Sequence, residues 1–409
     1  MSFGGAQGMY EKMMAAKREK EAAAAAAAAG SSAPAAGAGS AAAADKPPDG
    51  LKLTLPAIVP PKNGKLVIFG ATNYADMGKK VGKDLETDAT PNLPGPHRLL
   101  AGLGKVKLIS VITGGSSAHI VALGASGEVF AWGRNDAGQL GLGDQTRRDR
   151  PTRVTACDGK KVITASTGKS HTLFVAQSGT VYACGSCKHG ACGSGAPKRA
   201  EHVASPVAVP FSADGTQIKS VACGPNWNLA IDAAGDVWSW GWSEFGVLGN
   251  GTDHAHNTKD GTIKISYEAR AAPERVGRLK GENCVHVACG AQHCAAVSEA
   301  GMCYTWGSGG YGRLGHKDQA DVHTPKPFEE VRASNVVACG HAHTAFLGWP
   351  VLKNGMVCAN GLPSLYMCGR VKVHARPALS NGSRAPMPVL RQRRARLLTR
   401  AFARAPAAT

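Results

Sequence analysis

Residues 119–141 read HIVALGASGEVFAWGRNDAGQLG. Two short apolar segments, beginning at His119 and at Val129, flank a turn that contains Gly127. Short apolar runs bounded by glycine are typical of strands, and a small glycine turn between two of them predicts a β-hairpin. The second segment ends in Trp132-Gly133, and a glycine cluster follows at 138–141. The stretch therefore predicts antiparallel strands joined by tight turns.

The same pattern recurs along the chain, which indicates a repeat protein. Strands ending in aromatic-Gly, or in a variant of it, place their glycines 63, 52, 56 and 66 residues apart. These strand ends are Phe69-Gly70, Trp132-Gly133, Cys184-Gly185, Trp240-Gly241 and Trp306-Gly307. A second glycine cluster, beginning at Gly138, Gly246 or Gly312, follows three of them. We expect Trp132, Trp240 and Trp306 to be core residues, and the glycines to permit positive φ and close packing.

A Gly-x-x-His turn precedes each hairpin. It covers 168–171, 224–227, 290–293 and 340–343, and a longer version covers 115–119. The histidines His171, His293 and His343 recur once per repeat, whereas Trp227 takes this place in one repeat. Recurrence favours a structural role, so we expect each imidazole to satisfy backbone groups between strands. Contact with a binding partner is the alternative.

Each repeat offers about four short strands, and a single sheet of that size cannot bury both of its faces. Packing several such sheets around an axis buries them, and this arrangement is the β-propeller. The sequence therefore predicts an all-β propeller with four clear repeats and the start of a fifth.

We divide the chain into three parts. Residues 1–60 are Ala-rich and are expected to be disordered, residues 61–346 form the propeller, and residues 347–409 form a basic tail. The formal net charge is +18, and the tail holds 11 Lys or Arg without an Asp or Glu. Such a tail can bind nucleic acid or acidic surfaces, but solvated charge on a disordered end is the favoured interpretation.

Composition also argues against several classes of protein. There is no apolar stretch of about 20 residues, so we expect no membrane span. The N-terminus lacks a basic start followed by an apolar core, and its Glu11, Glu19 and Glu21 are unusual for a mitochondrial transit peptide. We therefore expect a nuclear or cytoplasmic protein. In that setting the 12 cysteines are expected to be buried thiols.

The repeat pattern ends abruptly after Phe346, so we expect an incomplete propeller with exposed terminal edges. Residues 365–370, Leu-Tyr-Met-Cys-Gly-Arg, resemble a fifth aromatic-Gly strand without the usual hairpin spacing before it or glycine cluster after it. The Ala-, Arg- and Pro-rich tail has the composition that a shifted reading frame gives. Sequencing the transcript tests this hypothesis, which a faithful read through Thr409 would refute.

The combination of aromatic-Gly, Gly-Gln-Leu-Gly and Gly-x-x-His resembles the regulator of chromosome condensation family, over residues 64–346. Segments similar to its second, mitotic branch are 66–73 (LVIFGATN), 95–98 (GPHR), 132–135 (WGRN) and 309–316 (GGYGRLGH). That branch also has an insertion before the last of these blades, as 251–283 is here. The resemblance implies a seven-bladed propeller that regulates a small GTPase as a guanine nucleotide exchange factor. It also implies association with chromosomes, spindle microtubules or the cell cortex.

Function is expected in the loops, because a propeller is a rigid scaffold that displays them. The candidate partner-binding residues are Lys169, Asn226, Gln292 and His341 in the Gly-x-x-His turns, and Lys259, Lys264 and Tyr267 in the insertion. The family's nuclear exchange factor tends to carry acidic residues in some of these turns. None is acidic here, which disfavours exchange on the nuclear transport GTPase.

Exchange factors bind the nucleotide-free GTPase more tightly than the loaded one, so we expect no catalytic residue, cofactor or small-molecule substrate. The alternative function is a scaffold that binds proteins, chromatin or microtubules without exchange activity.

Two further motifs have plainer interpretations. Residues 184–192 read Cys-x-x-Cys-x-His-x-x-Cys, and thiolates with imidazole suit zinc. However, Cys184 takes the aromatic place of its repeat, so packing within the blade is the favoured interpretation. Residues 307–312 match the dinucleotide fingerprint in letters, but no helical pattern follows to hold a pyrophosphate.

Overall fold

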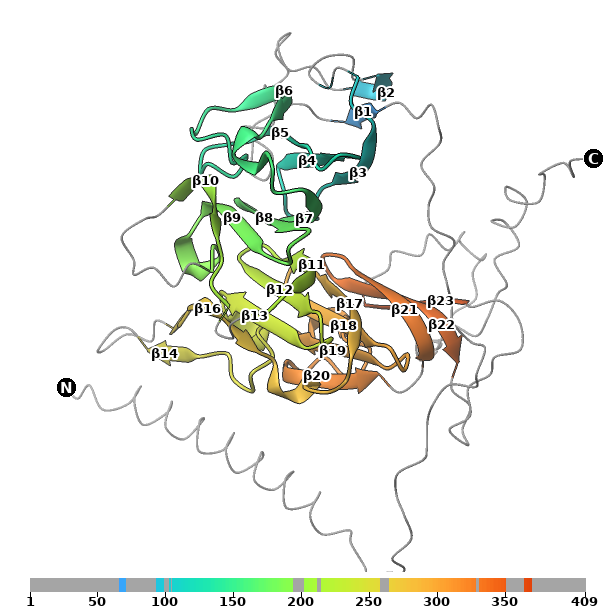
Figure 1. The fold of residues 1–409 in the computed structure, drawn as a ribbon. Helices are drawn as coiled ribbons and strands as arrows, with labels where there is room; N and C mark the ends of the chain where they lie inside the picture. Colours follow the sequence, from blue (N-terminus) through green and yellow to red (C-terminus); the bar gives the residue numbers. More distant parts are fainter. Residues whose placement is uncertain are drawn as a thin grey trace, which may run out of the picture. The chain divides into compact units, whose positions relative to one another are not determined.

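The computed structural model describes residues 66–70, 93–98, 103, 105–193, 202–211, 215–257, 265–328, 331–350 and 364–369. Within these residues the chain forms short antiparallel strands joined by turns (Figure 1). The predicted β-propeller fold is confirmed, because five successive sheets of three or four strands follow one another along the described chain. Residues 1–60 and the part of the tail after Gly369 lie outside this description. No described helix is long and apolar enough to cross a membrane.

Four of the sheets share one plan, in which four strands follow in chain order. We call these sheets blades 1 to 4. Blade 1 contains β3 (Leu108–Ile112), β4 (His119–Gly124), β5 (Val129–Gly133) and β6 (Arg148–Arg153). Blade 2 contains β7 (Val162–Thr167), β8 (His171–Ala176), β9 (Val181–Ser186) and β10 (His202–Ala208). Blade 3 contains β11 (Ile218–Cys223), β12 (Trp227–Asp232), β13 (Val237–Gly241) and β16 (Arg270–Arg275). Blade 4 contains β17 (Cys284–Cys289), β18 (His293–Ser298), β19 (Cys303–Gly307) and β20 (Val322–Phe328).

The remaining described strands form smaller sheets. Blade 5 has three strands, β21 (Val331–Cys339), β22 (His343–Pro350) and β23 (Ser364–Gly369), which run side by side in Figure 1. Two hairpins complete the set: β1 (Val67–Gly70) with β2 (Leu93–Arg98), and β14 (Ala255–Asn257) with β15 (Ile265–Tyr267). Short 3-10 turns occur at η1 (Thr155–Cys157), η2 (Lys188–Gly190), η3 (Glu244–Gly246), η4 (Gly277–Leu279) and η5 (Gly310–Gly312).

The hydrophobic core lies between neighbouring blades. One cluster joins Leu140 of blade 1 to Phe174 of blade 2, and another joins Val247 of blade 3 to Trp306 of blade 4. The second and third strands of blades 1 to 4 are buried along nearly their whole length, and Trp132, Trp240 and Trp306 all lie in the core. Burying one large apolar side chain contributes about 1.5–3 kcal/mol, so the contacts between blades hold the repeats together.

The recurring histidines bond to the next blade. The ring Nε2 of His119 lies 2.7 Å from Oγ1 of Thr172, and that of His171 lies 2.7 Å from Oδ1 of Asn228. His293 and Thr344 repeat the contact at 2.8 Å. We expected the imidazoles to satisfy backbone groups between strands; the structure instead shows their Nε2 bonded to side chains. The reason is geometric, because the partner is the residue that follows the histidine, or Trp227, of the next repeat, and it lies across the blade interface.

Each acceptor side chain is itself held by a turn. The side chain that contacts the histidine, or Trp227 in its place, also donates a hydrogen bond to a backbone carbonyl of the preceding blade. That carbonyl always belongs to the second residue of the Gly-x-x-Gly cluster. These donations are Thr172 to Gln139 at 2.7 Å, Asn228 to Ala191 at 2.8 Å, Cys294 to Val247 at 3.5 Å and Thr344 to Arg313 at 2.7 Å. The same carbonyls accept from the aromatic-slot residues Cys184, Trp240, Trp306 and Cys368.

Trp227 preserves this arrangement without a histidine. Its indole Nε1 lies 3.3 Å from Sγ of Cys294, the residue in the place of Thr172 and Thr344. Both side chains are fully enclosed, with Trp227 4% and Cys294 0% exposed. This position of the repeat therefore requires a side-chain N–H that reaches the next blade, and either an imidazole or an indole can supply it.

Glycine stands at the end of the third strand in blades 1, 3 and 4 and one residue before the end in blade 2, because no side chain fits there. Gly133 has φ of +109°, and a Cβ on it would lie 2.7 Å from the carbonyl oxygen of Ala118. L-residues rarely adopt this backbone conformation. The same conformation occurs at Gly185, Gly241 and Gly307, and positive φ also occurs at Gly138 and Gly312 in the following turns.

Two sequence-based expectations need correction. We assigned residues after Phe346 to a tail, but β22 continues to Pro350 and β23 pairs with it, with Phe346 opposite Tyr366. The third strand pairs with the backbone N–H and C=O groups along one edge of β22, which would otherwise lack partners. We also expected thiols throughout, whereas Cys187 and Cys192 form a disulfide. The turn η2 folds back between them and places their Cα atoms 4.8 Å apart.

Candidate partner-binding face

All Gly-x-x-His turns lie at one end of their sheets. The second strand begins at the histidine, or at Trp227 in blade 3, and its first residue pairs with the glycine near the end of the third strand, as His293 pairs with Gly307. The loop from the third to the fourth strand therefore starts at the same end. We call this end the turn face, and it brings together the Gly-x-x-His turns and the insertion in blade 3.

The four predicted turn residues differ in exposure. Lys169 and His341 are exposed, while Asn226 and Gln292 are half-buried. Backbone bonds join neighbouring turns, from the N–H of Lys169 to the carbonyl of Pro225 at 3.1 Å and from Ala291 to Gly340 at 3.2 Å. Polar side chains thus project from turns whose backbones are bonded in two pairs, blade 2 with blade 3 and blade 4 with blade 5.

These turns surround a shallow pocket at the first strands of the blades. It is lined by Gly115, Ser116, Thr167, Cys223, Gly224, Pro225, Cys289, Gly290, Ala291, Cys339, Gly340 and His341. Burial raises the pKa of the Cys223 thiol to about 12 and that of Cys289 well above its usual range. A thiol is nucleophilic as its thiolate, so these cysteines are poor nucleophiles near neutral pH. The pocket is suited to binding.

Arg313 holds two turns of this face together, and sequence reasoning did not identify it. Its guanidinium donates to the side-chain oxygen of Gln292 at 2.9 Å, to the carbonyl of His341 at 3.3 Å and to the carbonyl of Gly310 at 2.8 Å. The side chain is 2% exposed, and burial lowers its pKa. Gln292, one of the predicted contact residues, is therefore fixed by this bond.

A second region of the turn face is aromatic and acidic. The ring of Trp242 packs at a tilt against that of His189 of blade 2, with centroids 4.1 Å apart, and its centroid lies 5.8 Å from that of Tyr267. Its indole N–H donates to Glu244 at 3.1 Å. All four side chains are partly exposed. An amphipathic aromatic group of this kind, with one wet end, is typical of interaction surfaces.

Carboxylates gather around Tyr267. Burial raises the pKa of its hydroxyl, and the charges of Glu244, Asp253 and Asp321 raise it further. The Gly-x-x-His turns carry no acid, but these loops bring acids to the same face. The sequence shows that each of these acids follows an aromatic-Gly strand of blade 3 or 4. It does not show where the acids lie in space, because that depends on the path of the loops. Of the other predicted residues, Lys259 and Lys264 lie outside the described residues.

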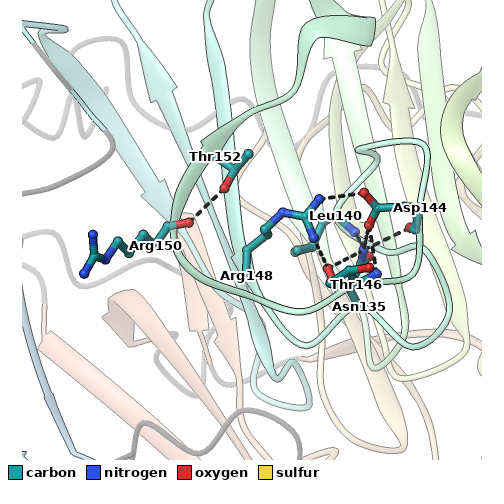
Figure 2. Close-up of polar contacts among 7 residues, drawn as sticks. All are labelled: Asn135, Leu140, Asp144, Thr146, Arg148, Arg150 and Thr152. Carbon is teal, nitrogen blue, oxygen red and sulfur yellow. Dashed lines mark hydrogen bonds and ion pairs between the residues drawn. The ribbon is translucent and has the colours of Figure 1, made fainter. Parts of the chain in front are cut away.

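The corresponding loop of blade 1 shows how such loops are fixed (Figure 2). Asn135 is buried, and its amide donates to the carbonyls of Asp144 and Thr146 at 2.9 and 3.0 Å. Arg148 donates to Asp144 and to the Thr146 carbonyl, both at 2.6 Å. The side chain of Arg150 points away from this network in Figure 2. Hydrogen bonds thus hold the buried Asn135 in place, whereas Arg150 on the outer strand β6 presents its charge away from the network.

Within the described residues, no group of three His, Cys, Asp or Glu has the geometry of a metal site. In the motif 184–192, Cys187 and Cys192 are bonded to each other, and Cys184 is buried with its thiol toward the Gln139 carbonyl. The functional groups that the turn face offers are hydrogen-bonding, aromatic and charged side chains on a rigid backbone.

Comparison with known proteins adds to this geometry. Residues 57–390 match the family described as RCC1-like domain. The protein RCC2 homolog of Danio rerio is 34% identical over 293 residues, which cover 68% of this chain and 58% of that protein. Protein RCC2 of Homo sapiens is 34% identical over 280 residues, covering 64% and 52%. The chain thus spans little more than half the length of these curated relatives.

Solved structures share the fold. The crystal structure of Prp20p from Saccharomyces cerevisiae superposes with a TM-score of 0.55 and 20% sequence identity, covering 66% of this chain and 61% of that one. At this identity the similarity concerns the fold alone. It agrees with the blade plan seen in the described residues.

Proposed function

This chain belongs to the family of RCC1-like domains, and from that membership we propose that it regulates a small GTPase by binding it through the turn face. The observation that carries the proposal is the family match over residues 57–390. The RCC2 proteins are relatives within the same family, and Prp20p, which shares the fold, has binding properties to Gsp1p and histones. The mitotic, chromosomal and microtubule associations of such regulators are part of this proposal.

The turn face supports the proposal physically. A regulator shifts a partner between two states only by as much as it binds one state better than the other. A surface that discriminates must hold its contacts in fixed positions, and the bonds between turns and through Arg313 provide this. Lys169 and His341 are exposed for contact, while Gln292 is already oriented.

Exchange activity would follow from the same binding. A surface that binds the nucleotide-free GTPase more tightly than the loaded form accelerates nucleotide release without any proton transfer or covalent step. Acidic and aromatic side chains around Trp242 suit a basic, amphipathic patch on the partner. We propose that Lys169, Asn226, Gln292, His341 and Tyr267 contribute contacts, with Lys259 and Lys264 in the same insertion as Tyr267.

The test is nucleotide release from a panel of purified Ran-, Rac-, Ral- and Arf-type GTPases carrying a fluorescent nucleotide. Acceleration of one member by the full chain, reduced at least tenfold in the double variant Lys169→Ala/His341→Ala, supports the proposal. The matched control is Lys219→Ala, because this exposed lysine lies near the start of β11, at the opposite end of its sheet. Equal loss in the control would contradict the turn face as the contact surface.

The second candidate function is a scaffold that binds proteins, chromatin or microtubules without exchange activity. The observation that favours it is the rigid, mixed-charge turn face, which suits binding whether or not a nucleotide is released. Pull-down of nucleotide-free and loaded GTPases, alongside nucleosomes and microtubules, separates the two functions. Binding that ignores the nucleotide state, with no accelerated release, favours the scaffold.

A further inference from the structure

Trp242 departs from the repeat of which it is part. The residue directly after the glycine of the third strand is polar in the other four-stranded blades, namely Arg134, Ser186 and Ser308. Its backbone N–H donates to a carbonyl of the Gly-x-x-His turn in all four blades, at 2.7 to 3.0 Å. The repeat therefore requires the backbone of this residue but not an indole, and a half-buried tryptophan on the turn face needs another explanation.

Two further rings flank this indole. The imidazole of His189 comes from η2 of blade 2, and the phenol of Tyr267 comes from β15 of the insertion. Their planes are inclined to the indole by 59° and 72°. Rings at such angles do not cover one another as a parallel stack does, and all three remain partly exposed. Exposed aromatic faces attract cations, and an indole does so most strongly.

Two acids beside these rings lack a cation. Glu244 accepts the indole N–H of Trp242 at 3.1 Å, and Asp253 accepts the backbone N–H of Ala255 at 3.1 Å. Burial raises the pKa of the Tyr267 hydroxyl, and the charges of both acids raise it further, so they lie close to the rings. Within the described part of the chain, neither carboxylate takes part in an ion pair.

The arginines of this region are engaged elsewhere. Arg270 of β16 pairs with Glu268 at 3.9 Å and with Glu274 at 4.0 Å. Burial lowers the pKa of Arg313, and the charge of Asp321 opposes this, so Asp321 already faces a cation. The two carboxylates beside the rings therefore keep a negative charge that a partner can neutralise.

A buried serine fixes the loop on which these acids lie. The Oγ of Ser243 lies 2.9 Å from the carbonyl oxygen of Asp253 and 2.7 Å from that of Glu268, on either side of the hairpin β14–β15. Ser243 is 0% exposed. Asn135, at the equivalent position of blade 1, holds its loop in the same way (Figure 2). A site that is fixed before its ligand arrives loses less conformational freedom on binding.

We propose that Trp242, Tyr267, Glu244 and Asp253 bind the guanidinium of an arginine side chain presented by a protein partner. The inference rests on the proposed function in so far as that partner is the GTPase. A guanidinium is planar, so it can lie on the indole while it donates two parallel N–H bonds to a carboxylate at the edge of the ring. A lysine ammonium is compact and strongly hydrated, and it cannot make both contacts in one plane. The site is therefore selective for arginine over lysine.

The third ring does not repel a cation. Burial lowers the pKa of His189, and the charge of Lys188 lowers it further, so the imidazole is neutral near pH 7. Lys188 itself is exposed, where solvent and salt screen its charge. An arriving guanidinium thus meets two carboxylates against one screened ammonium.

Fluorine NMR of the full-length chain labelled with 5-fluorotryptophan tests the site. The chain has seven tryptophans, and the Trp242 signal is the one lost in Trp242→Phe. A capped peptide Gly-Gly-Arg-Gly-Gly is titrated at low ionic strength, beside counterparts with citrulline or lysine in place of arginine. The Trp242 signal is expected to shift with arginine, and the affinity for both counterparts to be about fivefold weaker. A signal that ignores arginine, or responds equally to citrulline or lysine, would overturn the proposal.

A charge-neutralising variant locates the binding. Glu244→Gln keeps an oxygen for the indole N–H but removes the charge, so the affinity for the arginine peptide should fall about fivefold, the upper range for an ion pair at a partly exposed site. The matched control is Glu299→Gln, which removes an exposed acid just after β18, at the opposite end of its sheet from the turn face. Equal losses in both variants would mean attraction by overall charge and would contradict the site. The signals of the other tryptophans show whether each variant is folded.

Nucleotide release separates this inference from the proposed function. Arginine binding at Trp242 without accelerated release from any GTPase of the panel would support the site and count against the GTPase as its partner. Accelerated release that is equal in Glu244→Gln and the unaltered chain, with no response to the peptide, would support the proposed function and overturn the arginine site.

Discussion

The imidazole of His171 in blade 2 and the side-chain amide of Asn228 in blade 3 form a buried hydrogen bond of 2.7 Å across the blade interface. Asn228 also donates to the carbonyl of Ala191, which accepts from Trp240 as well. One amide therefore connects three segments that are far apart in the sequence. The same arrangement recurs between blades 1 and 2 and between blades 4 and 5, so these bonds set the spacing of the repeats.

Removing either partner of this bond should destabilise the protein. His171→Ala and Asn228→Ala each leave a buried polar group without its partner, which costs about 1–3 kcal/mol of unfolding free energy. The double variant is expected to cost less than the sum, because the second change removes the group left unpaired by the first. Urea unfolding of the four proteins measures this coupling, and strict additivity would show that the bond contributes nothing.

Acid should weaken the same interfaces. Burial lowers the pKa of His171 to about 4 and that of His119 and His293 to about 3, against about 6.5 in an unfolded chain. The unfolded chain therefore binds more protons between these values, so stability is lost as pH falls below about 6.5. At pH 5 each histidine is expected to cost about 2 kcal/mol relative to neutral pH.

Unfolding free energies measured by urea between pH 7.5 and pH 5 check this expectation. His171→Gln, which can still donate to Asn228 but does not titrate, should have a shallower pH dependence than the unaltered chain. An identical slope for the variant would mean that His171 is not protonated on unfolding in this range.

Substitution of Trp227 tests whether its position is equivalent to that of the repeated histidines. Trp227→His alone should cost about 2–4 kcal/mol, because a smaller ring leaves a cavity and its nitrogen then faces the weak acceptor Cys294. Adding Cys294→Thr recreates the His–Thr pair seen between His293 and Thr344, and about 1 kcal/mol is expected to return. Chemical denaturation compares both variants with Cys294→Thr alone. A double variant no more stable than Trp227→His would show that the slots are not equivalent.

Regular features of this fold could be predicted from the sequence because they repeat. The glycine at position 133 and the tryptophan at position 132 are dictated by local backbone and core geometry, and both recur at fixed offsets. Features that depend on loop paths could not be predicted in this way. The positions of His189 beside Trp242 and of Arg313 beside Gln292 arise only when the chain folds, because the partners belong to different segments.

The strand β23 shows the limit of prediction from a repeat pattern. Its Tyr-Met-Cys-Gly ending matched the repeat, but an irregular spacing before it hid the pairing with β22. Similarly, the Cys187–Cys192 disulfide was obscured because the same residues fit a zinc motif and a packing role. In both cases the local sequence motif was recognised, but more than one structure was compatible with it. Only the three-dimensional arrangement of the residues shows which of these structures forms.

The disulfide should be detectable in the folded protein. Alkylation without reductant is expected to leave the peptide containing Cys187 and Cys192 unmodified, and reduction should make both reactive. A bond closing so short a loop contributes about 2 kcal/mol, so reductant should lower the melting temperature by a few degrees. In Cys187→Ser/Cys192→Ser the reductant should have no such effect. Ready alkylation of both thiols in the untreated protein would contradict the bond.

Arg313 allows the sharpest test of how the turn face is held. Arg313→Ala removes donations to Gln292, His341 and Gly310 and leaves buried acceptors unsatisfied, so about 1–3 kcal/mol of stability should be lost. Amide exchange around 290–293 and 340–343 should accelerate, because both turns lose a shared anchor. Arg313→Gln is the matched comparison, since glutamine is the natural residue at the equivalent position 139 and can satisfy one acceptor. An intermediate exchange rate for glutamine, between arginine and alanine, would mean that hydrogen bonding fixes these turns. Equal rates in all three proteins would mean that the bonds between backbones hold the face without Arg313.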